Sequence, residues 1–411
     1  MTVGLQCALS DPCLDGQQGA SQRQLSISLQ ALMGGAGKTS LNLGLVLDHS
    51  GSMHGPPLRT VKEAAGQLVD QLTPTDTLSV VVFDHQAKVL VPLQAVENGD
   101  FIKGCIQTLK PSGGTAIDEG MKLGIEQVAK GKQGKVSQIF LLTDGENEHG
   151  DNDRCLKLAQ VAAEYNLTLN TLGFGDHWNQ DVLEAIADAG GGALAYIAAP
   201  EAAVTEFSRL LSRAQSVSLT NAHLHLTLMP GVRLAELKPV AQVAPETVEL
   251  TVIQEGNSVV VRLGDLMVDS PRIVLTNLYI TPPQDGSFPI AKVQVCYDAP
   301  GTDQTELWSD TVIVDGVAQA NYQPTPNDQV QHQVLTLAKY RQTQIAEQKL
   351  QAGDRQGAAT LLQSAAKTAL QMGDTGAATV LQQNATRLQA GKDLSEGDRK
   401  RTRIVSKTRL Q

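Results

Sequence analysis

The sequence predicts an α/β protein in which a doubly wound, mostly parallel sheet is inserted into a β-sandwich and followed by α-helical hairpins. Three observations support this prediction. Apolar strand-like runs alternate with amphipathic helix-like segments over residues 41–213, the pattern of a parallel α/β sheet. Residues 217–314 are almost entirely strand-like, with turns between the strands. Residues 327–388 are rich in Ala, Gln and Leu and show helical periodicity.

Residues 1–40 contain one predicted strand, because Leu25, Ile27, Leu29, Ala31 and Met33 alternate with more polar residues. The segment is too short for a separate domain, so we expect this strand to join a sheet completed later in the chain.

Residues 34–40 read Gly-Gly-Ala-Gly-Lys-Thr-Ser and superficially match a phosphate-binding loop. That motif needs a glycine where Leu32 stands, and a helix directly after Thr39, where a strand follows. We therefore interpret this segment as a flexible linker.

The α/β domain is predicted to span residues 41–213. Apolar runs indicate its strands, at residues 43–47, 77–83, 88–93, 137–143, 168–174 and 194–197. The alternation in 88–93 is typical of an edge strand or hairpin partner. Amphipathic segments indicate its helices, at residues 58–72, 100–109, 115–130, 153–165, 181–189 and 200–211.

The rest of the chain is divided at changes in composition. Residues 214–323 contain six predicted strands and form the sandwich, with the strand from residues 1–40 as its seventh. Residues 324–391 form a helical region in which Gly353-Asp354 and Gly373-Asp374 begin a weak repeat, each ending one helix and starting the next. Residues 392–411 turn from mixed charge to basic, and we expect a solvated, partly disordered tail. A segment that docks an acidic partner is the alternative.

Oxygen-bearing side chains gather where the first strand of the α/β domain ends. Asp48, Ser50 and Ser52 alternate there, and Gly51 allows a sharp turn. The carboxyl ends of strands are where open α/β sheets place their ligand sites. An all-oxygen donor set suits a hard divalent cation: Mg²⁺, Mn²⁺ or Ca²⁺.

The sequence Asp48-His49-Ser50-Gly51-Ser52 resembles the DxSxS signature of von Willebrand factor A (VWA) domains. Gly113-Gly114-Thr115 and Leu141-Leu142-Thr143-Asp144-Gly145 complete the family pattern, in order and after apolar strands. The resemblance covers residues 41–213 and extends to bacterial proteins with a flanking sandwich and C-terminal helices. It implies a metal-ion-dependent adhesion site (MIDAS) formed by Asp48, Ser50, Ser52, Thr115 and Asp144.

The resemblance also implies roles for these residues. Ser50 and Ser52 would bind the cation directly, Thr115 directly or through water, and Asp48 and Asp144 mainly through water. Mg²⁺ suits such a site because it retains water ligands, with Ca²⁺ or Mn²⁺ as alternatives. A carboxylate from a partner's Asp or Glu would complete the shell. We place the partner-binding rim at His49, Met53, Gly114 and Glu146.

Other residues have simpler interpretations. Thr115 and Asp118 match a helix capping box, and we interpret Asp118 as a cap only. Glu146, Glu148, Asp151 and Asp153 are predicted to form a solvated acidic loop rather than a second Ca²⁺ site. The five cysteines form no CxxC pair and are interpreted as free thiols, although Cys7 with Cys13, or Cys105 with Cys155, could form a redox switch.

Composition limits the functional classes. The net charge of −10 argues against a nucleic-acid partner. Neither a membrane-spanning run nor a signal peptide is visible in the sequence, so we expect a cytoplasmic protein. The leading hypothesis is a metal-dependent scaffold or adaptor that is not an enzyme. One alternative is a regulatory subunit or co-chaperone of a ring ATPase, such as a metal chelatase. A metal-dependent phosphohydrolase with Asp48 as nucleophile is the weaker alternative.

Overall fold

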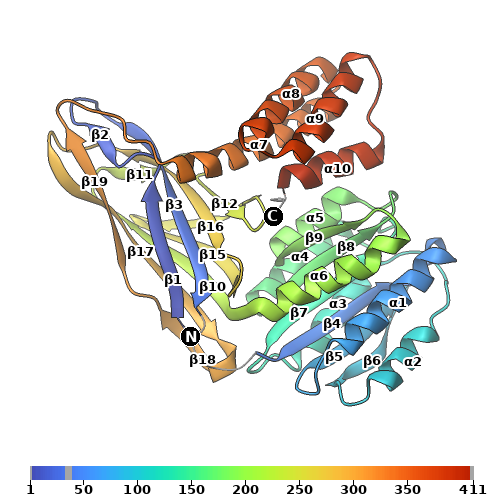
Figure 1. Cartoon of the computed structure of the whole chain (residues 1–411). Coiled ribbons are helices and arrows are strands. Elements are labelled where there is room, and N and C mark those ends of the chain that lie inside the picture. Colours follow the sequence, from blue (N-terminus) through green and yellow to red (C-terminus); the bar gives the residue numbers. More distant parts are fainter. Residues whose placement is uncertain (1, 33–38, 408–411) are drawn as a thin grey trace.

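The structure is a computed structural model of the 411-residue chain and describes residues 2–32 and 39–407. It has a β-sandwich, an α/β domain and a helical region (Figure 1). Most of the predicted Gly-rich linker lies outside the described residues. Among the helices of the described residues, none is both long and apolar enough to cross a membrane.

The sandwich consists of two sheets whose inner faces share one apolar core. The first sheet has the order β1 (Thr2–Leu9), β3 (Ser21–Leu32), β16 (Arg272–Ile280), β12 (Val240–Ala244) and β13 (Val248–Glu249), with β11 (Val232–Leu234) beside β16. The second has the order β14 (Val252–Glu255), β15 (Ser258–Met267), β10 (Val217–Leu228), β17 (Gly286–Ala299), β19 (Val312–Gln319) and β2 (Cys13–Asp15), with β18 (Gln304–Trp308) beside β17.

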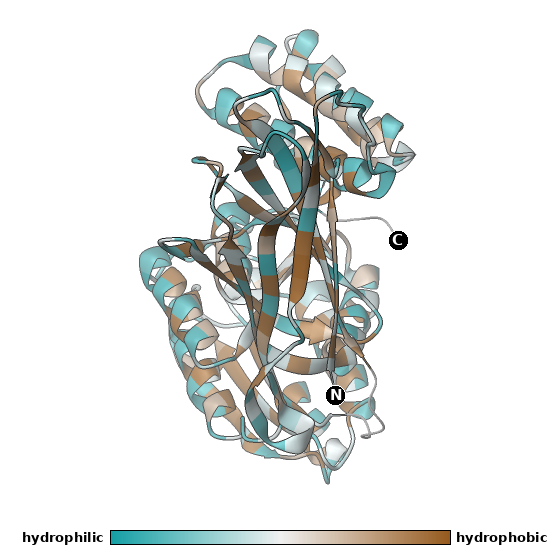
Figure 2. Cartoon of the chain, turned by 90° about the vertical axis from the view of Figure 1, so that its left-hand side faces the viewer, coloured by the Kyte–Doolittle hydropathy of each residue, from teal (hydrophilic) through white to brown (hydrophobic). Residues whose placement is uncertain are grey.

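The N-terminal strand completes the sandwich, as the sequence predicts. β3 pairs antiparallel with β16, and Ile27 lies opposite Val274 in this pairing. The chain therefore leaves the sandwich after β3, forms the α/β domain and returns through β10. Hydrophilic and hydrophobic residues alternate along the long strands, because one side of each faces the core (Figure 2). The sequence prediction missed β1 and β2, and also β11 and β12.

The α/β sheet has the strand order β6 (Ala87–Ala95), β5 (Thr77–Phe83), β4 (Leu41–Asp48), β7 (Val136–Thr143), β8 (Thr168–Phe174) and β9 (Gly191–Ile197). Only β6 runs antiparallel to its neighbour, at the edge. β4 is central and all its residues are buried. The first three strands in the chain lie on one side of the sheet and the last three on the other, which is the doubly wound arrangement.

Helices cover both faces of this sheet. On one face, α1 (Pro56–Asp70), α2 (Gly99–Gln107) and α6 (Ala203–Ser216) pack on residues that include Leu45 and Leu47. On the other face, α3 (Ile117–Ala129), α4 (Asn152–Glu164) and α5 (Gln180–Ala189) pack on residues that include Val46. α3 approaches β4 closely because Gly124 has no side chain: a Cβ there would lie 2.5 Å from Cγ2 of Val46.

The helical region comprises α7 (Asp328–Gln351), α8 (Arg355–Gln371), α9 (Thr375–Gln389) and α10 (Glu396–Lys407). The predicted repeat corresponds to two helix starts, where Asp354 accepts a hydrogen bond from Gly357 N and Asp374 from Ala377 N. The prediction of a solvated tail was wrong. Most of that segment is α10, which lies between α7–α9 and α5 of the α/β domain (Figure 1).

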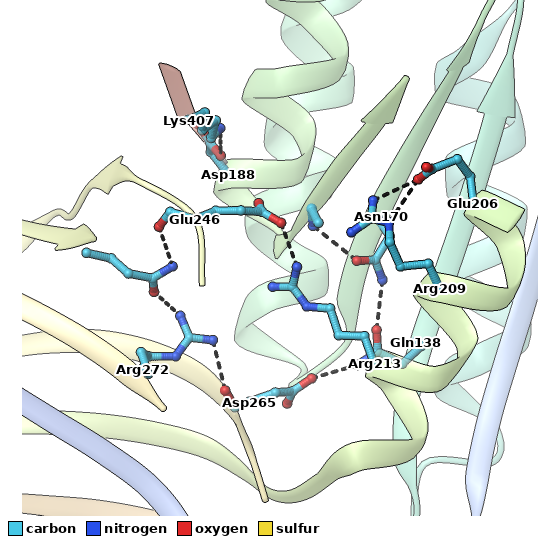
Figure 3. Close-up of polar contacts among 12 residues, drawn as sticks. Gln138, Asn170, Asp188, Glu206, Arg209, Arg213, Glu246, Asp265, Arg272 and Lys407 are labelled. Atoms are coloured by element: carbon cyan, nitrogen blue, oxygen red, sulfur yellow. Dashed lines mark hydrogen bonds and ion pairs between the residues drawn. The ribbon is translucent and has the colours of Figure 1, made fainter. Parts of the chain in front are cut away.

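A buried polar network joins the α/β domain to the sandwich at the amino ends of β7 and β8 (Figure 3). Asp265 of β15 accepts hydrogen bonds from Gln138 Nε2 and Thr168 Oγ1, both at 2.7 Å. Arg272 of β16 donates to the Asp265 carbonyl oxygen at 2.8 Å. Close by, Arg213 of α6 pairs with Glu246 at 2.6 Å. This joint lies at the end of the sheet opposite Asp48, so the carboxyl ends of the strands are not covered by it.

Candidate metal centre

The candidate site lies where the winding of the sheet changes direction. β4 ends at Asp48 and its neighbour β7 ends at Thr143, directly before Asp144. The next helix after β4 is α1, which packs on one face of the sheet, and the next after β7 is α4, which packs on the other. A crevice forms at such a switch point, and ligands of open α/β sheets bind there.

Asp48 lies at the base of this crevice and is fully buried. Its Oδ1 accepts a hydrogen bond from Ser50 N at 2.7 Å, and its Oδ2 accepts one from Thr143 Oγ1 at 2.6 Å. Burial raises the pKa of this carboxyl from its ordinary value of 3.8 to about 6, although the two hydrogen bonds oppose the shift. Asp48 therefore fixes the turn that carries the serines, and its charge is costly without a nearby cation.

A chain of side-chain hydrogen bonds connects the serines to Asp144. The Ser50 and Ser52 Oγ atoms are 3.0 Å apart, and Ser52 Oγ donates to Asp144 Oδ1 at 2.6 Å. Burial raises the pKa of Asp144 as well, while Ser52 and the charge of His177 oppose this shift. The short 3₁₀ turn η1 (Gly51–Met53) presents Ser52 to Asp144.

Thr115 belongs to a third loop, which lies beside the turn that carries the two serines. Gly51 N donates to the Gly113 carbonyl oxygen at 3.0 Å, which joins this loop to the serine turn. Gly113 has a φ of +65°, a conformation that glycine adopts without strain. A Cβ at Gly145 would lie 3.4 Å from Thr115 Oγ1 and 3.8 Å from Ser52 Oγ, so both hydroxyls lie against the turn that follows β7.

Four of the five predicted ligands line one cavity of about 620 Å³: Ser50, Ser52, Thr115 and Asp144. Asp48 lies behind Ser50. Three hydroxyl groups and the Asp144 carboxylate therefore face one cavity, and the Asp48 carboxylate supports them from behind. These five residues come from three loops. This donor set fits a hard divalent cation, because such ions take oxygen ligands and Mg²⁺ retains part of its water shell.

The structure places two of the four residues of the predicted partner-binding rim at the cavity. Gly114 and Glu146 line the cavity. Met53 instead is fully buried in the core beneath α1, because η1 turns its apolar side chain inward. His49 is also buried, and its Nδ1 lies 3.0 Å from the Lys110 carbonyl oxygen.

Sequence reasoning missed several residues at the cavity. Phe174, Gly175 and His177 line it from the end of β8, and Pro57 belongs to the same wall. Glu148 of the predicted acidic loop also lines the cavity. The rule that led to Asp48, that ligand sites lie at the carboxyl ends of strands, also applies to β8 and could have found His177. Thr143 was also missed as the partner of Asp48, although it belongs to the Thr-Asp-Gly motif.

The interpretation of Asp118 as a helix cap was wrong. The capping residue of α3 is Ala116, so Asp118 is not part of a capping box; it pairs with Arg154 at 2.8 Å.

All five cysteines are free thiols, as the sequence analysis expects. Cys105 and Cys155 pack on opposite faces of the α/β sheet, and Cys7 and Cys13 belong to different sheets of the sandwich, so neither predicted redox pair is placed to form. Burial also raises the pKa of Cys7 and of Cys155 to about 12, which disfavours the reactive thiolate.

The acidic loop after Asp144 contains a helix cap. Asp151 caps α4, with its Oδ1 accepting hydrogen bonds from Asp153 N and Arg154 N. Over residues 2–32 and 39–407, no group of three or more His, Cys, Asp or Glu side chains is arranged to hold a metal ion. The candidate centre differs from such groups because hydroxyls supply most of its donors.

Comparisons with known proteins identify two parts of the chain. The family model of the von Willebrand factor type A domain matches residues 42–209, and that of the Sll0103-like C-terminal alpha-helical domain matches residues 328–411. "Uncharacterized protein sll0103" of Synechocystis sp. is 59% identical over 412 residues, covering all of this chain and 98% of the relative. Bovine inter-alpha-trypsin inhibitor heavy chain H4 is 30% identical over 162 residues, but these cover only 37% of this chain and 18% of that protein.

Two solved structures share the fold over the whole chain. A von Willebrand factor type A protein from Catenulispora acidiphila superimposes with a TM-score of 0.83 at 18% identity, covering 99% of this chain and 97% of that one. The ArnB paralog VWA2 from Sulfolobus acidocaldarius gives a TM-score of 0.61 at 15% identity, covering 99% and 98%. The arrangement of sandwich, α/β domain and helices is therefore shared by proteins of low sequence identity.

Proposed function

Because this chain belongs to the Sll0103-like family of von Willebrand factor type A domain proteins, we propose that it is a divalent-cation-dependent protein-binding module. The observation that supports this most strongly is the convergence of Ser50, Ser52, Thr115 and Asp144 on one cavity, with Asp48 buried behind them. These residues come from three loops that are far apart in the sequence. Turn and capping roles would explain each residue singly, but they do not explain why all five meet.

In this proposal each residue has a distinct role. Ser50, Ser52 and Thr115 would hold Mg²⁺, or Ca²⁺ or Mn²⁺, through their hydroxyl oxygens, and Asp48 and Asp144 would supply negative charge. Asp48 also fixes the loop by accepting the Ser50 N–H. A bound cation would offer an electrophilic position to a carboxylate oxygen. Because only two carboxylates face a divalent ion, an Asp or Glu of a partner protein would be attracted to it.

The geometry favours binding over hydrolysis. A phosphohydrolase would need the Asp48 carboxylate to reach a substrate, but this side chain is fully buried and both its oxygens accept hydrogen bonds. Cooperation with a ring ATPase and a cytoplasmic location stay predictions. Co-purification with such an ATPase would support the first.

The proposal can be tested by capture of partners on the immobilised full chain. We expect proteins from a lysate of the source organism to bind in Mg²⁺, to elute with a chelator, and to be absent from a Ser50→Ala column. Ser208→Ala makes the same change on α6, where its hydroxyl contacts Gln71, and serves as the matched control. Partners that remain bound in chelator, or that bind the Ser50→Ala protein equally, would contradict the proposal.

A further inference from the structure

The last helix, α10, touches the α/β domain through polar side chains. Two of its buried residues, Lys400 and Lys407, contact that domain. Arg403 pairs with Glu184 of α5 at 2.9 Å, and Lys407 pairs with Asp188 at 2.5 Å. Interfaces of this polar kind resemble transient contacts between domains more than the core of one domain.

The opposite side of α10 is attached to the helical region. Asn384 Nδ2 of α9 donates to Thr402 Oγ1 at 2.6 Å, and Val405 packs against the alanine-rich core of α8 and α9. α10 therefore connects the helical region to the α/β domain, and its position depends on both.

Lys400 of α10 contacts the loop that forms one wall of the candidate metal cavity. Its Nζ donates to the backbone carbonyl oxygens of Asp176 and Trp178, at 2.5 and 2.9 Å, and lies 4.2 Å from the centre of the Trp178 ring. His177, which stands between those two residues, lines the cavity. Only 4% of Lys400 is exposed. A buried ammonium group needs such partners, so this contact is specific in its geometry.

The loop that carries His177 is held from two sides. From the core, Trp178 Nε1 donates to the Gly175 carbonyl oxygen at 2.7 Å, and the ring occupies the space where a Cβ of Gly173 would lie. From outside, Lys400 binds the carbonyl groups before and after His177. Electrostatics gives a second connection. Burial lowers the pKa of Lys400, and the charges of Glu396, Asp176 and, with the smallest effect, Glu146 of the cavity wall oppose this shift.

We propose that Lys400 is a positioning residue of the metal site: it holds the His177 loop as a wall of the cavity and so couples the C-terminal helical region to cation binding. This inference rests on the proposed function. Coupling between two equilibria is reciprocal. A change that weakens the docking of α10 on the α/β domain therefore changes cation affinity, and cation binding changes the docking equilibrium of α10 by the same factor.

The test is Mn²⁺ affinity of the full chain, measured by calorimetry. We expect Lys400→Met to weaken Mn²⁺ binding by about fivefold or more, the lower end of measured couplings between sites. Removing a positive charge would by itself strengthen cation binding, so weakening identifies loss of positioning. Lys400→Arg keeps the charge and the contact with the ring, and should restore the affinity. Arg399→Gln, whose side chain pairs with Glu347 of the helical region, is the matched control and should bind Mn²⁺ like the wild type.

A spectroscopic readout accompanies the affinity. In a Trp308→Phe background Trp178 is the sole tryptophan, and Mg²⁺ should change its emission; in the Lys400→Met protein that change should be absent. If Lys400→Met fails to fold, Arg403→Gln loosens the same helix and should weaken Mn²⁺ binding in the same direction.

The outcomes separate the two proposals. A wild-type chain that binds Mn²⁺ no better than Ser50→Ala would overturn both the metal site and this inference. Wild-type binding that exceeds Ser50→Ala, together with unchanged or tighter binding by a folded Lys400→Met protein, would overturn only the role of Lys400.

Discussion

At the scale of single residues, the site depends on a carboxyl group that is costly to bury. The pKa of Asp48 is raised from 3.8 to about 6, mainly by burial. In the absence of a divalent cation the folded state therefore holds this proton more tightly than the unfolded state. The stability gained from this is fully present below about pH 4 and is lost as the pH rises through about 6.

We predict that Asp48→Asn removes this dependence. Between pH 4 and 7, in chelator, the free energy of unfolding of the wild type should fall relative to that of the variant by about 2 kcal/mol, most of the value of a shift of about two pKa units. Urea denaturation across this pH range measures the difference. Parallel pH profiles for the two proteins would show that burial does not raise the pKa of Asp48.

The same residue predicts how cation binding depends on pH. A cation and a proton compete for the Asp48 carboxylate, so Mn²⁺ affinity should be constant above about pH 7 and fall by up to about tenfold per pH unit well below pH 6. Calorimetric titrations at several pH values test this. An affinity that does not change between pH 5 and 7 would contradict a charged Asp48 in the bound state.

At the scale of elements, the helical repeat provides a matched pair of caps. Asp354 and Asp374 both accept a hydrogen bond from a backbone N–H at a helix start. They differ in their ion pairs: Asp354 pairs with the exposed Lys349, whereas Asp374 pairs with Lys339, whose side chain is only 2% exposed.

Asparagine at either position keeps the cap but removes the carboxylate. We expect Asp374→Asn to cost about 3 kcal/mol, because Lys339 is left buried without its counter-charge. Asp354→Asn should cost less than about 1 kcal/mol, since its ion pair is exposed. Hydrogen exchange of α8 and α9 amides reports the difference locally. Equal costs at the two positions would show that the Lys339 pair contributes little.

The elements also show what the sequence could and could not predict. β5 and β8 were predicted with their observed bounds, because uninterrupted apolar runs between turns indicate buried strands. α10 was predicted as a solvated tail because its buried side chains are Lys400, Thr402, Ser406 and Lys407, which have no hydrophobic periodicity to detect. Its burial depends on carboxylates and carbonyls supplied by α5 and the loop before it, which no local pattern reveals.

Prediction of the candidate site was limited in the same way, because local sequence patterns do not show how residues are placed by the fold. Asp48, Ser50, Ser52, Thr115 and Asp144 were found because strand ends and a family motif mark them, and the structure brings them together. Met53 was misplaced because position in a motif does not determine which way a side chain turns. His177 follows the end of β8, so the strand-end rule could have marked it as a candidate, but its nearness to these five residues depends on β8 lying beside β7.

At the scale of the whole molecule, buried polar joints hold the parts together. Asp265 accepts a hydrogen bond from Gln138 across the boundary between the sandwich and the α/β domain (Figure 3). It accepts a second one from Thr168. Asp265→Ala leaves two buried donors without this acceptor, at a cost of about 2–4 kcal/mol. We expect the joint to loosen, seen as a larger radius of gyration in solution scattering and faster proteolysis between the two parts.

The exposed Asp269, in the turn after β15, is the control for that change. Asp269→Ala should leave the scattering profile and the cleavage rate unchanged. A compact, protease-resistant Asp265→Ala protein would show that the apolar contacts of the joint suffice without the network.

The central claim, that these five residues hold a divalent cation, is tested most directly by anomalous diffraction from crystals soaked in Mn²⁺. We predict one strong anomalous peak in the cavity within coordination distance of the Ser50, Ser52 and Thr115 hydroxyls, and its disappearance in Ser50→Ala crystals. Crystals that take up Mn²⁺ elsewhere, or show no peak between these hydroxyls at saturating metal, would contradict it.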